Sequence, residues 1–128
     1  NVSVHPTEPD ADPMHDWLES TARIKREVPD DVLVLPSHHD CFRGLHARLD
    51  YLATSQLRTL ERLRSTLKEP RRAIDVFAAL FGRRIDEADA GLLALATGEG
   101  VACLNYLLHR GEASRNLDEA GVAWYRMQ

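Results

Sequence analysis

The stretch that decides the fold is residues 32–46, VLVLPSHHDCFRGLH. It opens on four consecutive β-branched and aliphatic residues, a pattern typical of a short strand that is buried on both faces of a sheet. Pro36 ends this run, and His38 and His39 follow in a polar loop. Open α/β sheets build their sites at the carboxyl ends of strands, and neutral imidazole is the commonest metal ligand. The loop is therefore a candidate metal site.

The segment before this stretch has the pattern of a helix over residues 13–28. Asp12 is suited to cap the helix and Pro13 to occupy its first position. Inward-facing positions then recur at helical spacing, at Met14, Trp17, Leu18, Thr21, Ile24 and Val28. Residues 29–31 break the helix. A helix, a break, a buried strand and a polar loop together indicate one α/β layer element.

The chain after Gly44 is mostly helical. We expect a long amphipathic helix over residues 44–67, with a stripe formed by Leu45, Leu49, Leu52, Leu60, Leu63 and Leu67. Pro70 then precedes a short helix over residues 71–81, whose inward face consists of Ile74, Phe77, Ala78 and Phe81. We expect Asp86 to cap a third helix that runs to about His109.

The last expected element is a β-hairpin, with strands over residues 114–117 and 122–126 around a turn at residues 118–121. Three helices followed by a hairpin are the order of a winged-helix module. The predicted fold is mostly α: residues 1–43 form the end of an α/β domain, and residues 44–128 form a helical, winged-helix-like domain with a terminal hairpin.

Composition limits the classes of function. The 128 residues are 44% hydrophobic and 28% charged, as in an ordinary globular protein, and the net charge of −4 argues against general nucleic-acid binding. No continuous apolar run approaches the roughly 20 residues that cross a bilayer. The two cysteines form no CxxC pair, so we expect reduced thiols and a cytoplasmic protein without membrane or nucleic-acid partners. Because Asn1 opens neither a signal peptide nor a chain with an initiator Met, we expect a fragment.

Residues 35–38, Leu-Pro-Ser-His, followed by residues 42–46 and a long helix, resemble the last metal-ligand loop of the metallo-β-lactamase superfamily. More narrowly, they resemble glyoxalase II-like hydrolases with a winged-helix-like C-terminal cap. Residues 73–76, 98–107 and 121–126 are similar to helices and the closing strand of that cap. The resemblance implies that residues 1–43 end a domain of the metallo-β-lactamase αββα type.

In that family a Pro-Ser-His-Gly turn presents the last histidine to the second of two metal ions. The resemblance therefore implies that His38 is the ligand, with His39, which stands where the family usually has Gly, as the alternative. The family's His-x-His-x-Asp-His motif is absent from this sequence. What the resemblance implies is a di-zinc site that is incomplete here, and a missing N-terminal metallo-β-lactamase domain as the partner.

The resemblance also implies a longer parent protein, of which this chain is a C-terminal segment. The parent is expected to hydrolyse a small-molecule ester, thioester, lactone or phosphodiester, and the segment alone to be inactive. No residue of the segment is assigned a catalytic role. Asp40, Arg43 and His46 are candidates for contacts with substrate or with the metal ligands. The alternatives are a turn cap for Asp40, an exposed loop arginine for Arg43 and a partly buried residue at a helix start for His46.

Two other functions stay open. A winged-helix module could bind DNA, but the third helix carries Asp86, Glu87, Asp89 and Glu99, which would repel phosphates. The leucine-rich helix could instead pair with its own copy and make the chain a homodimer.

Overall fold

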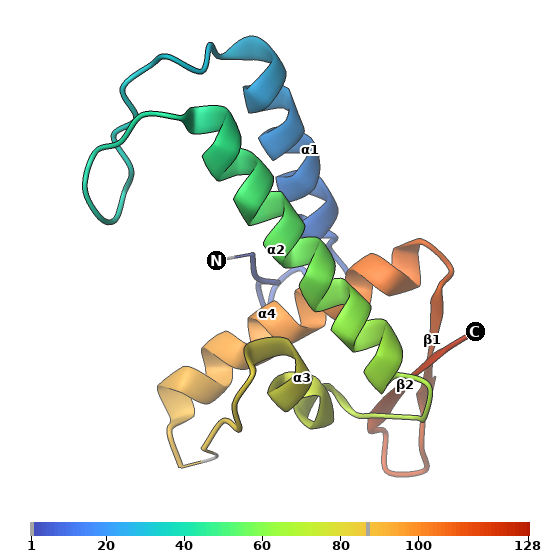
Figure 1. The fold of residues 1–128 in the computed structure, drawn as a ribbon. Coiled ribbons are helices and arrows are strands. Elements are labelled where there is room, and N and C mark those ends of the chain that lie inside the picture. The colour runs from blue at the N-terminus through green and yellow to red at the C-terminus, as the bar shows by residue number, and fades with distance from the viewer. Residues whose placement is uncertain (1, 87) are drawn as a thin grey trace.

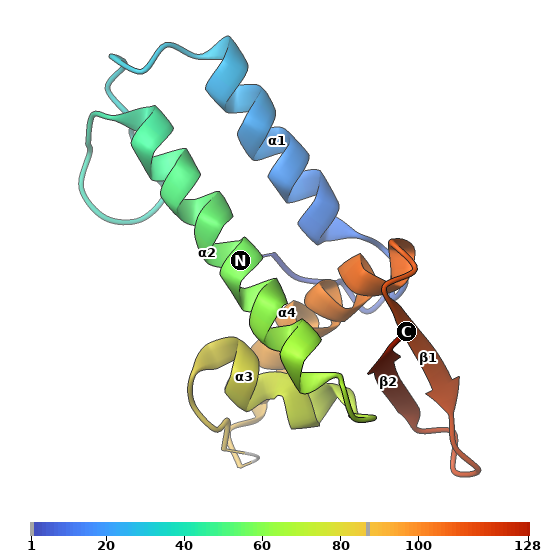
Figure 2. The same ribbon diagram turned by 45° about the vertical axis from the view of Figure 1, so that its right-hand side comes forward.

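The computed structural model describes residues 2–86 and 88–128. Helices α1 (Pro13–Glu27) and α2 (Leu45–Thr66) run side by side, and α2 continues into a lower part of the molecule (Figures 1 and 2). That part contains the 3₁₀ helix η1 (Ala73–Val76), α3 (Phe77–Phe81), α4 (Ala90–His109), and strands β1 (Ala113–Leu117) and β2 (Ala123–Met127). The observed fold is thus mostly α with one two-stranded sheet.

The two long helices begin and end almost where their sequence signals predict. The Asp12 carboxylate accepts a hydrogen bond from the His15 amide at 3.1 Å, and Pro13 opens α1 as expected. Helix α2 starts after Gly44, whose φ of 86° lies in the left-handed region that glycine tolerates. Both helix predictions are confirmed.

The core is a cluster formed by the C-terminal half of α2 together with η1, α3, α4 and the hairpin. The last three leucines of the predicted stripe, Leu60, Leu63 and Leu67, are fully shielded from solvent there. Leu104 and Leu107 of α4 belong to the same cluster, together with Phe77, Leu80, Tyr106 and Tyr125. The stripe is therefore used inside the chain, as an amphipathic helix requires.

The prediction of a buried strand over residues 32–35 is wrong. Only Val34 pairs, through an antiparallel bridge with Phe42 whose N···O distances are 2.8 and 3.1 Å. Leu33 and Leu35 are 53% and 75% exposed. A strand buried on both faces needs neighbouring strands and covering layers, and the described residues supply none beside this segment. The apolar composition of residues 32–35 favours burial, but the described residues leave Leu33 and Leu35 exposed.

The short helix expected over residues 71–81 begins later and with a tighter turn. Arg71 is held extended because its backbone N and O pair with Tyr125 at 2.9 and 2.7 Å. The first helical turn, η1, is 3₁₀, with three residues per turn rather than 3.6. This change of period turns Val76 and Leu80 inward and leaves Ile74 and Ala78 exposed, which corrects the expected inward face.

Helix α4 also begins later than predicted. Its cap is Asp89, which accepts from the Leu92 amide at 2.9 Å, whereas Asp86 accepts from the Ala88 amide in a preceding turn. Glu87 lies outside the described residues. By length and composition, α4 is the one helix in the described part of the chain that could cross a membrane, with a mean hydropathy of 1.4. In this structure it packs against α1, η1, α3 and β1.

The terminal hairpin is confirmed, with Ala113 opposite Met127 and Leu117 opposite Ala123. Asp118 organises its turn by accepting hydrogen bonds from the Ala120 and Val122 amides and from the Trp124 indole, each at 2.8–2.9 Å. The indole hydrogen bond is the main reason why the pKa of Asp118 is lowered. Met127 donates its amide to the Leu67 carbonyl at 2.9 Å, which fixes the hairpin to the end of α2.

A bidentate ion pair joins α2 to the start of β1. Arg64 donates from Nε to Glu112 Oε2 at 2.6 Å and from Nη2 to Oε1 at 3.1 Å. The Arg64 hydrogen bonds lower the pKa of Glu112, so the carboxylate stabilises the fold above the usual pKa of glutamate and loses this effect as the pH falls through the lowered value.

We expect Glu112→Gln to lower the free energy of unfolding by about 1 kcal/mol at pH 7, since this pair is well aligned and partly buried. The difference from the wild type should begin to shrink as the pH falls below the usual glutamate pKa of roughly 4.3, and should vanish only below the lowered pKa of the folded state. Urea denaturation at pH 7 and pH 3.5 measures it. Glu61→Gln, which removes the exposed partner of the same arginine, is the control. An equal cost at both pH values would contradict the assignment to charge.

Candidate metal-ligand loop

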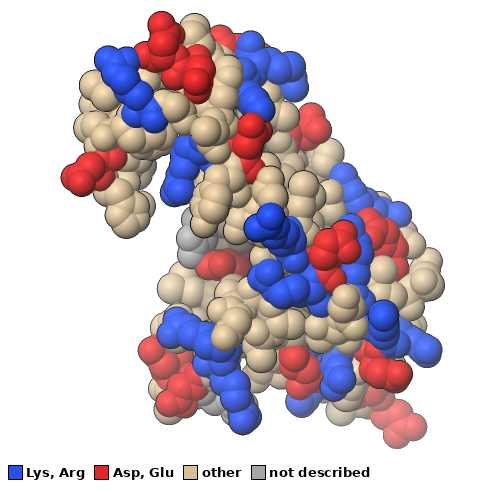
Figure 3. All heavy atoms as spheres, in the orientation of Figure 1, with Lys and Arg blue, Asp and Glu red and all other residues tan. Residues whose placement is uncertain are grey.

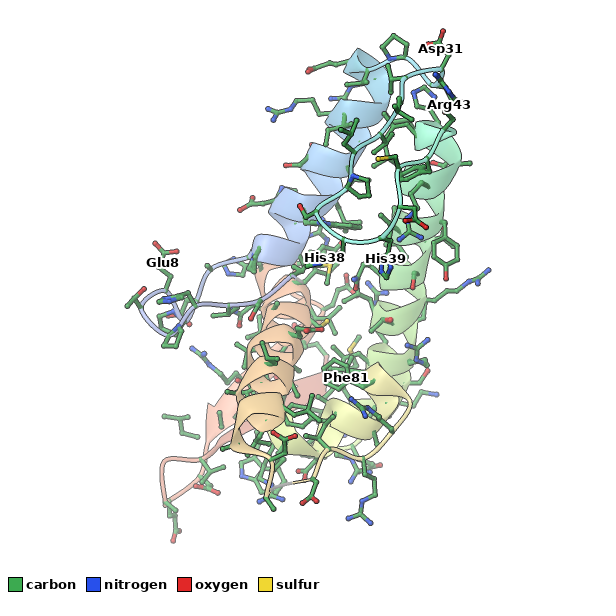
Figure 4. The ribbon with its side chains drawn as sticks, turned by 90° about the vertical axis from the view of Figure 1, so that its left-hand side faces the viewer. Glu8, Asp31, His38, His39, Arg43 and Phe81 are labelled. Atoms are coloured by element: carbon green, nitrogen blue, oxygen red, sulfur yellow. The ribbon has the colours of Figure 1, made fainter. Side chains whose placement is uncertain are left out.

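His38 and His39 lie next to each other at the tip of the loop that the Val34–Phe42 bridge closes (Figure 4). Both side chains are exposed. Within residues 2–86 and 88–128, neither imidazole has a hydrogen-bond or ion-pair partner. A ring nitrogen of either residue is therefore available to an incoming metal ion.

The backbone at His39 has a conformation that favours glycine. Its φ is 69°, and His39 is the only non-glycine residue with a positive φ in the described part of the chain. An L-residue with a side chain is strained in this region, at a cost of about 1–2 kcal/mol. The turn thus keeps the backbone that glycine would adopt, although the position carries histidine.

We expect His39→Gly to raise the free energy of unfolding of the 128-residue chain by up to about 1 kcal/mol, because it removes this strain. His38→Gly is the matched control and should not stabilise, since His38 has no positive φ. Parallel urea titrations of the two variants decide the question. Equal effects would mean that the left-handed turn is not maintained in solution.

The two ends of the loop are tied to the end of α1. The Asp30 carboxylate accepts from the His46 amide at 2.7 Å, and the His46 ring donates from Nε2 to the Val28 carbonyl at 2.8 Å. Arg43 donates from its guanidinium to the Asp31 carbonyl. These contacts hold the start of α2 against the turn after α1. The Asp30 contact was not predicted, although an acidic side chain near a helix N-terminus is a recognisable signal.

The structure therefore separates the candidate residues into two groups. His38, His39 and Asp40 line a hollow of about 680 Å³ between the loop and α2. Arg43 and His46 do not line it and instead hold the loop ends. The hollow is mostly apolar, and its described lining includes one cationic side chain, Arg48, beside Val34, Phe42, Leu45, Leu49 and Leu52.

The imidazoles of His38 and His39 could form part of a metal site. Imidazole suits zinc, but no group of three or more His, Cys, Asp or Glu side chains able to hold a metal was found among the described residues. Neither cysteine extends the set. Both are free thiols, and burial raises the pKa of Cys103 to about 12, so that this thiol stays protonated.

Comparison with known proteins identifies the family of the chain. Residues 60–128 match the family described as metallo-beta-lactamase-like, C-terminal domain. No curated protein matches the chain. A crystal structure of a beta-lactamase domain protein from Burkholderia ambifaria is similar, with 36% identity and a TM-score of 0.92, over 100% of this chain and 37% of that chain.

A metallo-beta-lactamase family protein from Thermus thermophilus has a similar fold, with a TM-score of 0.74 and 22% identity, over 91% of this chain and 34% of that chain. The chain thus spans little more than a third of the length of these proteins. The predicted boundary between residues 43 and 44 stays a prediction, and the family match begins inside α2. Because that match covers more than half of the 128 residues, the chain belongs to the metallo-β-lactamase-like family, of which it carries the C-terminal domain.

Proposed function

We propose that this chain is the C-terminal part of a metal-dependent hydrolase of the metallo-β-lactamase superfamily, similar to glyoxalase II, in which His38 is the last metal ligand. The observation that carries the proposal is the loop itself. Its tip holds two imidazoles that have no protein partner among the described residues, and three hydrogen bonds join the loop ends to each other, to the residue after α1 and to the start of α2. A ligand loop has to be fixed at its ends and open at its tip.

In this proposal the residues have distinct roles. His38 holds one of two zinc ions, and such ions polarise the substrate and activate a water molecule when bound. Asp40 lines the same hollow as His38 and contacts the substrate there. Arg43 and His46 position the loop through the Asp31 and Val28 carbonyls.

The remaining parts of the proposal concern the parent. The helical segment from Gly44 onward is a winged-helix-like cap over the substrate cleft, and the partner is an N-terminal metallo-β-lactamase domain of the same polypeptide. The substrate is a small-molecule ester, thioester or phosphodiester, and the protein is cytoplasmic. Similarity to relatives of about three times the length supports this arrangement.

The structure gives little support to the alternative functions. In a DNA-binding winged helix the third helix has to enter a groove, but α4 packs against four other elements. Dimerisation through the leucine stripe would need an exposed stripe, whereas Leu60, Leu63 and Leu67 are fully buried.

We expect the isolated 128-residue chain to bind zinc weakly and to hydrolyse neither esters nor thioesters, because catalytic zinc sites need about three protein ligands. The full-length parent should contain up to two zinc ions and be active. Elemental analysis and hydrolysis assays on both proteins provide the test. Stoichiometric, chelator-sensitive zinc together with activity in the isolated chain would overturn the proposal.

A further inference from the structure

The hollow between the candidate ligand loop and α2 combines an apolar floor with one cation. Leu45, Leu49 and Leu52 line it and follow one another at helical spacing on α2. Leu45 and Leu49 are only 8% and 9% exposed. Arg48 lies three residues after Leu45 and four before Leu52, and side chains at these spacings are neighbours on a helix. The guanidinium therefore stands beside the leucine floor.

Arg48 has a defined place on the helix but no anionic partner. Its guanidinium carbon lies 5.6 Å from the centroid of the Tyr51 ring, in a cation–π contact. This contact holds the cation near the ring without using its N–H donors. In the part of the chain that the structure describes, these donors meet neither a carboxylate nor a carbonyl oxygen. They are therefore available to an anion that enters the hollow.

The other arginine near the loop is already engaged. Arg43 donates to the Asp31 carbonyl and does not line the hollow. Figure 4 shows Arg43 at the end of the loop far from His38 and His39. Arg48, in contrast, lines the same hollow as both histidines. A molecule that reaches the imidazoles therefore meets Arg48 rather than Arg43.

The wider surface offers no substitute for this local cation. Figure 3 shows a surface that is hollowed between the upper and lower parts of the molecule, with basic and acidic side chains intermingled on the face that it draws. The net charge of the chain is −4. Because a broad positive field is what attracts anions over a distance, recognition of an anion here depends on direct contact with Arg48.

We propose that this hollow selects substrates of the parent that carry both an apolar chain and an anionic group, and that Arg48 binds the anion. The inference rests on the proposed function, because His38 and Asp40 line the same hollow. Its volume of about 680 Å³ lies within the range of small-molecule sites, roughly 300–1,000 Å³. The apolar chain lies on the leucine floor, and the anion accepts hydrogen bonds from the guanidinium.

The chemistry of the hollow calls for both parts of this ligand. The planar fork of donors in a guanidinium matches the paired oxygens of a carboxylate or a phosphate. Such a contact is stronger beside an apolar floor than in open water, since the local dielectric constant is lower. An aliphatic chain on the leucines gains roughly fourfold in affinity for each methylene that it buries. A ligand with only one of the two parts uses half of the site.

Equilibrium binding to the full-length parent tests the site without catalysis. Isothermal titration calorimetry compares octanoate and octyl phosphate with the neutral octanamide. At least one of the two anions should bind about tenfold more tightly than octanamide, and the tighter one identifies the group that is recognised. Arg48→Met should abolish this preference. Arg58→Met, at an exposed arginine of α2 outside the hollow, should keep it. Equal affinities for all three ligands, or a preference that survives Arg48→Met, would overturn the inference.

Hydrolysis separates this inference from the proposed function. Mono-para-nitrophenyl adipate and para-nitrophenyl hexanoate have acyl chains of equal length, and only the adipate ester ends in a carboxylate. Arg48→Met should lower the ratio of their kcat/KM values about tenfold, through KM rather than kcat, and Arg48→Lys should restore part of it. A metal-containing parent that hydrolyses both esters with the same ratio after Arg48→Met would disprove the inference and leave the proposed function standing. A parent without metal or activity would disprove the proposed function, and the binding of octanoate then decides the role of Arg48.

Discussion

His38→Ala is expected to reduce the turnover of the full-length parent by more than about 100-fold and to lower its metal content at one of two sites. The removed imidazole is exposed at the loop tip and has no protein partner among the described residues, so its loss harms no contact of the fold. Losing a direct ligand removes the metal or misplaces the activated water. That effect exceeds the 10- to 100-fold loss, roughly, that follows from changing a residue behind the ligands.

The neighbouring histidine provides the control. His39→Ala should keep most of the activity, and His39→Gly should keep it with a more stable loop, because the left-handed backbone at this position suits glycine. His46→Ala should fall between His38→Ala and His39→Ala, since its ring supports the loop through the Val28 carbonyl. Metal analysis and steady-state kinetics measure all of these variants.

One pattern of results would reverse the assignment. If metal content and turnover were indifferent to His38 but collapsed on replacement of His39, the ligand would be His39 and the register of the loop would be off by one residue. His39→Gly would then be inactive rather than stabilised and active. Urea denaturation of each variant separates a loss of metal from a loss of fold.

The elements that the sequence predicted well are those specified by local signals. Helix α1 follows from Asp12-Pro13 and its apolar spacing, α2 from its leucine stripe, and the hairpin from the turn at Asp118. Each signal acts within a few residues of the structure that it specifies. Local hydrogen bonds and amphipathic spacing are therefore enough to place these boundaries within one or two residues.

The predictions that failed depend on distant partners. Val32 to Leu35 has the composition of a buried strand, but the neighbours that would bury it are not among the described residues, so only Val34 pairs. The start of the short helix was misplaced because Arg71 bonds to Tyr125, more than 50 residues later in the chain. The burial of Val76 and Leu80 follows from a 3₁₀ turn that apolar spacing does not reveal.

The candidate site was likewise predictable only in part. The resemblance predicts His38 as the ligand with His39 as the alternative, and this stays a prediction. That position 39 keeps the backbone of a glycine is known only from the structure. The resemblance left open whether Arg43 contacts substrate or is an exposed loop arginine, and whether His46 serves the site or is a partly buried residue at a helix start. Their contacts with the Asp31 and Val28 carbonyls were not predicted, because these partners carry no sequence signal. Any residue type offers the same carbonyl, so such contacts become visible only in the folded chain.

The largest effect on stability is expected from Leu63→Ala, which should lower the free energy of unfolding of the 128-residue chain by about 3 kcal/mol. Leu63 is fully buried in the core cluster that also contains Leu104 and Phe77, and truncation leaves a cavity that the surrounding side chains fill only in part. A typical domain is stable by only about 5–15 kcal/mol, so this loss is large.

Leu57→Ala is the matched control, because it makes the same substitution in the same helix at a side chain that is 46% exposed. Its cost should stay below about 1 kcal/mol, since little apolar surface returns to water and no cavity forms. Urea titrations monitored by circular dichroism give both values, with equal m-values expected if the unfolded states are alike. Comparable costs for the two variants would mean that this face of α2 is not buried in the core cluster, and that the stripe is free to pair elsewhere.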